Sequence, residues 1–117
     1  MATDALIVFC TFPTMEEARR VIRELVELNL IACGNIFPGI ESIYRWKGVV
    51  ETSAEALAIL KTTEESFDQL QVEFKSRHSY EVPELVAIPI AAGLPNYLKW
   101  IHENVQVEVH GRKRTDR

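Results

Sequence analysis

Hydrophobic and polar positions alternate along a long stretch in the first half of the chain, and this alternation predicts a β-hairpin. One strand runs from Ile31 to Trp46, a tight turn falls at Lys47-Gly48, and a second strand runs from Val49 to Thr62. A strand of this length would span about 50 Å, whereas a compact domain of this size is roughly 35 Å across. The hairpin must therefore bend, for which Pro38-Gly39 is the suitable place, or pair with another chain.

Other segments carry the periodicity of buried strands and amphipathic helices. Ala5 to Phe12 is a nearly unbroken apolar run, which is typical of a strand buried on both faces. Thr14 and Glu17 form a capping-box pattern that predicts the start of a helix. The remaining expected elements are the end of that helix near Asn29, a second helix from Thr62–Glu65 to about Arg77, a loop from His78 to Glu84, a strand from Leu85 to Ile90, a short helix beginning at Pro95 with Tyr97, Leu98 and Ile101 facing inward, and a last strand from Gln106 to Val109.

The order of these elements indicates an α+β fold, a ferredoxin-like β-α-β-β-α-β sandwich with an extra C-terminal helix and strand. The sheet of such a fold carries helices on one face only. Three expected strands are nevertheless apolar on both sides, at Leu6–Phe9, Ala56–Leu60 and Val86–Ile90. One copy would expose more apolar area than is usual for a monomer. We therefore expect an obligate cyclic oligomer in which sheets pack together and hairpins pair across copies.

Composition and charge exclude several classes of protein. The 117 residues, 47% of them hydrophobic, suit one globular domain, residues 1–109, followed by a basic tail, residues 110–117. The net charge of −4 argues against nucleic-acid binding, and no apolar run approaches the roughly 20 residues of a membrane span. No signal peptide is recognisable, and the two cysteines fit a reducing cytosol. We expect a cytoplasmic protein with neither nucleic acid nor a membrane as its partner.

Several motifs resemble the signature of one known family. These are Cys33–Gly39, then Ser42, Tyr44, Trp46 and Gly48, then Leu60-Lys61-Thr62, the loop His78–Glu84, and Tyr97, Leu98 and Trp100 in the terminal helix. Together they resemble the CutA family of divalent-cation-tolerance proteins, and the similarity covers roughly residues 5–104.

The resemblance implies a homotrimer of ferredoxin-like subunits, similar in build to the PII signalling proteins, and a link to tolerance of copper and other divalent metals. Copper binding in the family is assigned to a cysteine that carries over to Cys10 and to a histidine that carries over to His78. The chain departs from the family pattern at Ser79, where proline is usual, and at Arg77, where some members have a second histidine.

Two groups of residues are candidate sites. The first is Cys10 with His78, because thiolate and imidazole ligands suit copper or another divalent cation such as zinc. Two ligands make a weak site, so a third would come from Glu84, from water or from a neighbouring copy. Alternatively, Cys10 is a small buried hydrophobic residue and His78 is a loop residue bonded to the backbone.

The second group, which the family resemblance implies more than the spacing does, is Lys61, Tyr80 and Glu84, with Trp46 near the hairpin tip, in the cleft between subunits. We interpret it either as an ion-pair and hydrogen-bond network at a subunit junction, in which Glu55 or Glu84 balances Lys61, or as a pocket for a small anion or metabolite. The sequence shows no Ser-His-Asp arrangement, phosphate loop or carboxylate pair of forced geometry, so we do not expect an enzyme.

These observations favour a trimeric CutA-like protein that binds a copper-like divalent cation weakly and contributes to divalent-cation tolerance. Two alternatives stay open. One is a PII-like signalling module that binds a small metabolite in the cleft between subunits, and the other is a non-catalytic trimeric scaffold that presents surfaces to other proteins.

Overall fold

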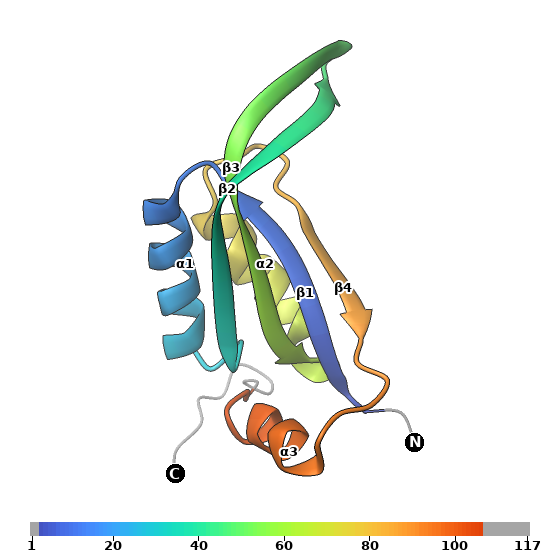
Figure 1. Cartoon of the computed structure of the whole chain (residues 1–117). Helices are drawn as coiled ribbons and strands as arrows, with labels where there is room; N and C mark the ends of the chain where they lie inside the picture. The colour runs from blue at the N-terminus through green and yellow to red at the C-terminus, as the bar shows by residue number, and fades with distance from the viewer. Residues whose placement is uncertain (1–2, 107–117) are drawn as a thin grey trace.

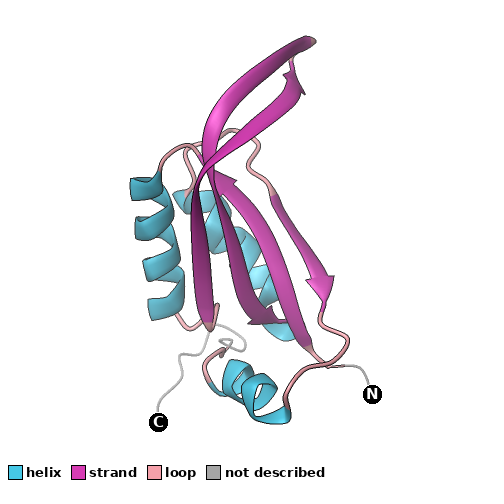
Figure 2. Ribbon diagram, in the orientation of Figure 1, coloured by secondary structure: helices cyan, strands magenta, loops and turns pink. Residues whose placement is uncertain are grey.

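A four-stranded antiparallel sheet with helices on one face forms the body of the chain. The computed structural model describes residues 3–106. The strand order is β2-β3-β1-β4, and every neighbouring pair is antiparallel. This arrangement confirms the expected α+β class and the β-α-β-β-α-β order followed by a further helix. In chain order the elements are β1 (Ala5–Phe12), α1 (Met15–Glu27), β2 (Cys33–Trp46), β3 (Val49–Thr63), the 3₁₀ turn η1 (Glu64–Ser66), α2 (Phe67–Arg77), β4 (Leu85–Pro89) and α3 (Pro95–Glu103) (Figure 1, Figure 2).

The observed bounds differ from the expected ones by one to a few residues. Helix α1 ends at Glu27 because Asn29 adopts a left-handed conformation (φ 62°) that terminates it. Strand β2 begins at Cys33 rather than Ile31, since Ile31 and Ala32 are buried in the connection that precedes it. The strand expected at 106–109 lies outside the described residues except for Gln106.

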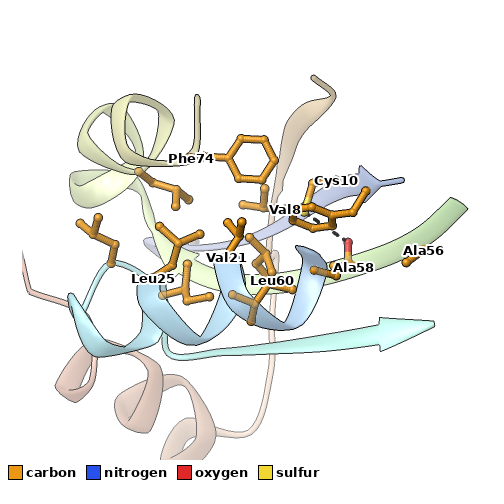
Figure 3. Close-up of a cluster of buried hydrophobic side chains, with 14 of the residues drawn as sticks. Val8, Cys10, Val21, Leu25, Ala56, Ala58, Leu60 and Phe74 are labelled. Carbon is orange, nitrogen blue, oxygen red and sulfur yellow. Dashed lines mark hydrogen bonds between the residues drawn. The ribbon is translucent and has the colours of Figure 1, made fainter. Parts of the chain in front are cut away.

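The hydrophobic core lies between the sheet and helices α1 and α2. Alternate residues of β1, Leu6 to Phe12, point toward the helices and pack with the apolar stripes of α1 and α2 and with alternate residues of β3 (Figure 3). Helix α1 lies close to β2 at Gly34, where an added Cβ would be 2.7 Å from the Ile22 side chain. The labelled core side chains in Figure 3 are Val8, Cys10, Val21, Leu25, Ala56, Ala58, Leu60 and Phe74.

The opposite face of the sheet carries no helix among residues 3–106 and is largely apolar along β1, β4 and the adjoining half of β3; we call it the open face. Residues that alternate with the core positions lie on it, and β1 aligns Ile7 with Lys61 and Ile88, and Phe9 with Ile59 and Val86. Val86 is 52% exposed and Ile88 is 50% exposed. The alternation therefore places apolar side chains on both faces of the sheet, as the sequence pattern predicts.

The β2–β3 hairpin is bent and projects beyond the helices (Figure 1). The pairing register shifts between Phe37 and Ile40, and Gly39 there has φ 69°, so the expected bend at Pro38-Gly39 is confirmed. At the tip, Lys47 and Gly48 both have positive φ, as a two-residue hairpin turn requires. The body measures 47 × 31 × 24 Å, which is long for a chain of this size.

Helix α3 closes the end of the sheet opposite the hairpin tip (Figure 1). Ile101 is fully buried and packs with Ala5, Ala32 and Leu98 in a second, smaller cluster. Tyr97, expected to face inward, is 42% exposed instead: its ring stacks on Trp100 with centroids 5.6 Å apart, and its hydroxyl lies 4.0 Å from Cys33 Sγ at the start of β2. None of the helices described is long and apolar enough to span a membrane.

Candidate functional site

A cavity of about 650 Å³ lies where the hairpin leaves the body of the sheet. One wall is the hairpin, with Tyr44, Trp46 and Glu55, and the other is the loop between α2 and β4, with Tyr80 and Glu84. The alternation of β3 places Glu55 on the same side of the strand as Leu57 and Ile59. The cavity is therefore continuous with the open face, and we call it the hairpin cleft.

A hydrogen bond between Tyr80 and Glu55 joins the two walls of this cleft. The phenolic hydroxyl of Tyr80 donates to Glu55 Oε2 at 2.6 Å, and Glu55 is only 9% exposed. Burial raises the pKa of the Tyr80 hydroxyl, and the hydrogen bond to the Glu55 carboxylate raises it further. The phenol therefore stays protonated and acts only as a donor to the buried carboxylate.

Glu84 stands beside this pair at the start of β4. Its pKa is raised, first by partial burial and then by the nearby negative charge of Glu55. Glu51 and Glu81 also line the cleft. Among the residues 3–106 that the structure describes, the cleft is lined by four carboxylates and by no lysine or arginine.

Cys10 points away from the hairpin cleft, into the core between sheet and helices. It is fully buried, and its thiol lies 4.0 Å from the carbonyl oxygen of Ala58, to which it donates (Figure 3). Burial raises the pKa of the thiol to about 12, with a smaller contribution from the charge of Glu84. A thiolate, the form that binds metals, is therefore strongly disfavoured here.

The side chain of His78 is buried, and both of its ring nitrogens are already engaged. Nε2 lies 2.7 Å from the carbonyl oxygen of Thr11, which can only accept, so Nε2 carries the proton. Nδ1 accepts the backbone N–H of Tyr80 at 3.0 Å. The ring also stacks on Phe12 with centroids 4.9 Å apart. His78 thus holds the loop that carries Tyr80, and neither nitrogen is free for a metal in this arrangement.

The three residues expected to ligate copper do not form a ligand set within one copy. Within residues 3–106, no group of three or more His, Cys, Asp or Glu side chains is placed to hold a metal ion. Cys10 would have to lose its proton, and His78 would have to give up a hydrogen bond, before either could coordinate one. Their role as ligands, with Glu84, stays a prediction.

Of the residues expected in the cleft, the structure brings three together and leaves one apart. Trp46, Tyr80 and Glu84 all line the cavity. Lys61 lies further along β3 on the open face, where its ammonium donates to Asn35 Oδ1. The expected placement of Lys61 beside Glu84 is therefore not found within one copy.

Sequence reasoning missed what Glu17 does. Thr14 Oγ1 accepts the backbone N–H of Glu17 at 3.1 Å, as the capping pattern predicts. The Glu17 carboxylate does not return to Thr14 but accepts from the backbone N–H and the hydroxyl of Ser79, both at 2.8 Å. Ser79, one of the two departures from the family motif, is thereby tied to helix α1.

Arg77, the other departure, is also used structurally. Its guanidinium donates to Glu24 Oε1 at 2.9 Å and forms an ion pair with Glu73, so it joins α2 to α1. The hydrogen bond to Glu73 raises the already high pKa of the guanidinium. The sequence signal for the ion pair within α2 is the position of Glu73, one helical turn before Arg77.

Comparison with known proteins matches nearly all of the described residues to a single protein family. The family model named CutA1 divalent ion tolerance protein matches residues 6–104. The divalent-cation tolerance protein CutA of Thermus thermophilus is 48% identical over 98 residues, which is 84% of this chain and 95% of the relative. A rice relative named protein CutA 1, chloroplastic, is 41% identical over 87% of this chain and 58% of its own length.

Solved structures agree with this result. The crystal structure of CutA1 from rice has a TM-score of 0.87 at 39% identity, over 92% of this chain and 98% of that one. The divalent cation tolerance protein from T. thermophilus has a TM-score of 0.85 at 46% identity, over 87% and 99%. A third, titled periplasmic divalent cation tolerance protein CutA from Archaeoglobus fulgidus, has a TM-score of 0.84 at 42% identity, over 87% and 99%.

Proposed function

The chain belongs to the CutA1 divalent ion tolerance protein family, and from this membership we propose that it is a non-enzymatic homotrimer that binds a divalent cation weakly and contributes to divalent-cation tolerance. The observation that carries the proposed assembly is the apolar open face, which no helix among the described residues covers. The cation comes from the family's name and from the chemistry of the residues predicted to ligate it.

The open face supports assembly because a single copy leaves apolar side chains from three neighbouring strands in water. Phe9 and Ile59 are partly exposed beside the half-exposed Val86 and Ile88. Stable monomers seldom expose a contiguous patch of this kind. The strand order supports the ferredoxin-like assignment, and closed cyclic symmetry would cover the patch on every copy. The number three rests on the family resemblance.

Strand β2 adds a second reason for assembly. It lies at the edge of the sheet and continues into the projecting half of the hairpin, where Ile43, Val49 and Val50 are exposed. A long apolar edge strand invites pairing with another chain. In the proposed trimer the hairpin of each copy pairs with a neighbour.

The metal proposal assigns Cys10, His78 and Glu84 as ligands of copper or a similar divalent cation. Because Cys10 holds its proton and His78 is hydrogen-bonded on both nitrogens, metal binding must compete with these contacts. We therefore propose weak binding, with a further ligand from water or from a neighbouring copy.

Titration of Cu(II) and Zn(II) into protein purified without an affinity tag tests this assignment. Cys10→Ala and His78→Ala should each weaken binding, and Cys33→Ala, which removes the other thiol, should not. Unchanged affinity in both ligand variants would leave the proposed ligands without a role. Circular dichroism of each variant controls for loss of structure.

The size of the hairpin cleft favours a second function, recognition of a small metabolite as in a PII-like signalling module. A cavity of about 650 Å³ bordered by Tyr44, Trp46 and Tyr80 has the size and aromatic lining of small-molecule sites. A thermal-shift screen of nucleotides, organic acids and amines tests it, because a ligand at 100 times its dissociation constant adds about 2.7 kcal/mol of stability. A screen without any shift would remove this candidate.

We also propose a cytoplasmic location, since both cysteines are free and suit a reducing compartment. Fractionation of cells that express the native chain, followed by immunoblotting, tests this. Recovery with a periplasmic or organelle marker would contradict it.

A further inference from the structure

Glu55 is a buried carboxylate that has no positive partner among residues 3–106. Within the described part of the chain, its carboxylate accepts one side-chain hydrogen bond, the neutral one from Tyr80 to Oε2. No lysine, arginine or histidine in the described part of the chain forms an ion pair with it, although 91% of the residue is removed from solvent. Buried charges in proteins are generally paired with an opposite charge or a metal ion, and one neutral hydrogen bond does not replace that partner. Among the described residues, Glu55 therefore has a neutral hydrogen-bond partner at Oε2 but no positive one.

Lys61, on the same face of the sheet, is a base that has no acidic partner among the described residues. Its ammonium is partly buried and has one neutral partner, Asn35 Oδ1. Among the described residues, no carboxylate lies within ion-pair distance of it. Each copy thus carries one incompletely paired acid and one incompletely paired base on its open face.

These two groups cannot reach each other within one chain. They occupy alternate positions of the regular strand β3, with Leu57 and Ile59 between them. Six residues of extended strand separate them by about 20 Å, far beyond the length of both side chains. If they pair, the partner is on another copy.

We infer that Lys61 of one copy pairs with Glu55 of the next copy around the ring, and that the hairpin cleft is incomplete until this neighbouring lysine enters it. The inference rests on the trimer proposed above. In a cyclic assembly each interface joins two different parts of the surface, so every copy gives one lysine to one neighbour and receives one from the other.

The charges and apolar side chains of the open face are consistent with Lys61 of a neighbouring copy entering the hairpin cleft. Within residues 3–106, the cleft is lined by four carboxylates and no lysine or arginine, whereas the ammonium of Lys61 at the other end of the open face has no carboxylate within ion-pair distance. The partly exposed Leu57 and Ile59 lie between the two ends and would pack against the neighbouring sheet. Complementary charges at the two ends would fix the register of that packing.

Charge reversal tests the pairing directly. Lys61→Glu and Glu55→Lys each place like charges at every interface, and the trimer dissociation constant should rise at least about tenfold. The double variant restores opposite charges and should recover assembly. In an equimolar mixture of the two single variants, native mass spectrometry should show mixed trimers in preference to either homotrimer, because two of the three interfaces of a mixed trimer join opposite charges. Lys99→Glu, on a side chain that is 73% exposed, is the matched control and should assemble normally.

Three results would overturn the inference while leaving the trimer intact: single variants that assemble as well as the wild type, a double variant no better than the weaker single one, or no mixed oligomers. A wild-type chain that is itself monomeric would instead overturn the proposed trimer.

Should a reversed single variant not fold, the neutral substitutions Lys61→Met and Glu55→Gln replace it. Coupling then appears as a double variant that loses no more than either single one. Strictly additive losses would contradict the pairing.

Discussion

Tyr80 Oη donates a 2.6 Å hydrogen bond to Glu55 Oε2, and this contact connects the loop after α2 with the base of the β2–β3 hairpin. The same loop is fixed at its start by His78, whose ring contacts the backbone of both Thr11 and Tyr80, and by Glu17, which binds Ser79. The shape of the hairpin cleft therefore depends on a few polar contacts between segments far apart in sequence.

Tyr80→Phe should destabilise the protein by about 1 to 3 kcal/mol, because it leaves the buried Glu55 carboxylate without its donor. Chemical denaturation at a fixed chain concentration measures the loss. Tyr44→Phe is the control: it removes a hydroxyl that contacts Ser53 Oγ at 3.3 Å in an exposed position, and should change stability by less than about 0.5 kcal/mol. Equal losses of stability in the two variants would show that the Tyr80–Glu55 hydrogen bond contributes no more than an exposed contact does.

Cys10 should be unreactive toward thiol reagents in the folded protein at pH 8. Its raised pKa of about 12 keeps the thiol protonated until the pH approaches that value, and burial blocks access to it. A Cys33→Ser variant, which retains Cys10 as its one thiol, makes the alkylation rate specific to this residue. The rate should rise steeply when denaturant unfolds the chain, and equal rates before and after unfolding would contradict the buried, protonated thiol.

Ile88→Glu should weaken assembly because it places a charge on the apolar part of the open face, where Ile88 of the edge strand β4 aligns with Ile7 of β1. Sedimentation velocity across chain concentrations should show smaller species than the wild type. Val72→Glu, on the outer surface of α2 and 65% exposed, introduces the same charge away from the open face. Both variants assembling like the wild type would show that the open face is not an interface.

The sequence pattern predicted local structure well where one or two residues determine it. Lys47-Gly48 and Pro38-Gly39 require special backbone geometry, and both were found at the turn and the bulge. Thr14 was correctly identified as a helix cap. Its expected partner Glu17 was not, because a carboxylate at that position can bind either its own helix or a loop, and only tertiary structure decides between them.

The candidate site was harder to predict because it depends on distance in space. Trp46, Tyr80 and Glu84 meet in the hairpin cleft although more than 30 residues separate Trp46 from Tyr80 along the chain. Lys61 was grouped with them, yet the regular rise of β3 carries it away from the cleft. Tyr97 was expected inside because apolar periodicity alone does not distinguish a buried face from an exposed aromatic one.

The central claim is that copies of this chain cover one another's open faces. Multi-angle light scattering of the tag-free protein at low micromolar concentration tests it most directly. We predict a mass close to three times the 13.4 kDa of one chain. A mass of one chain, with a circular dichroism spectrum of a folded protein, would contradict the claim.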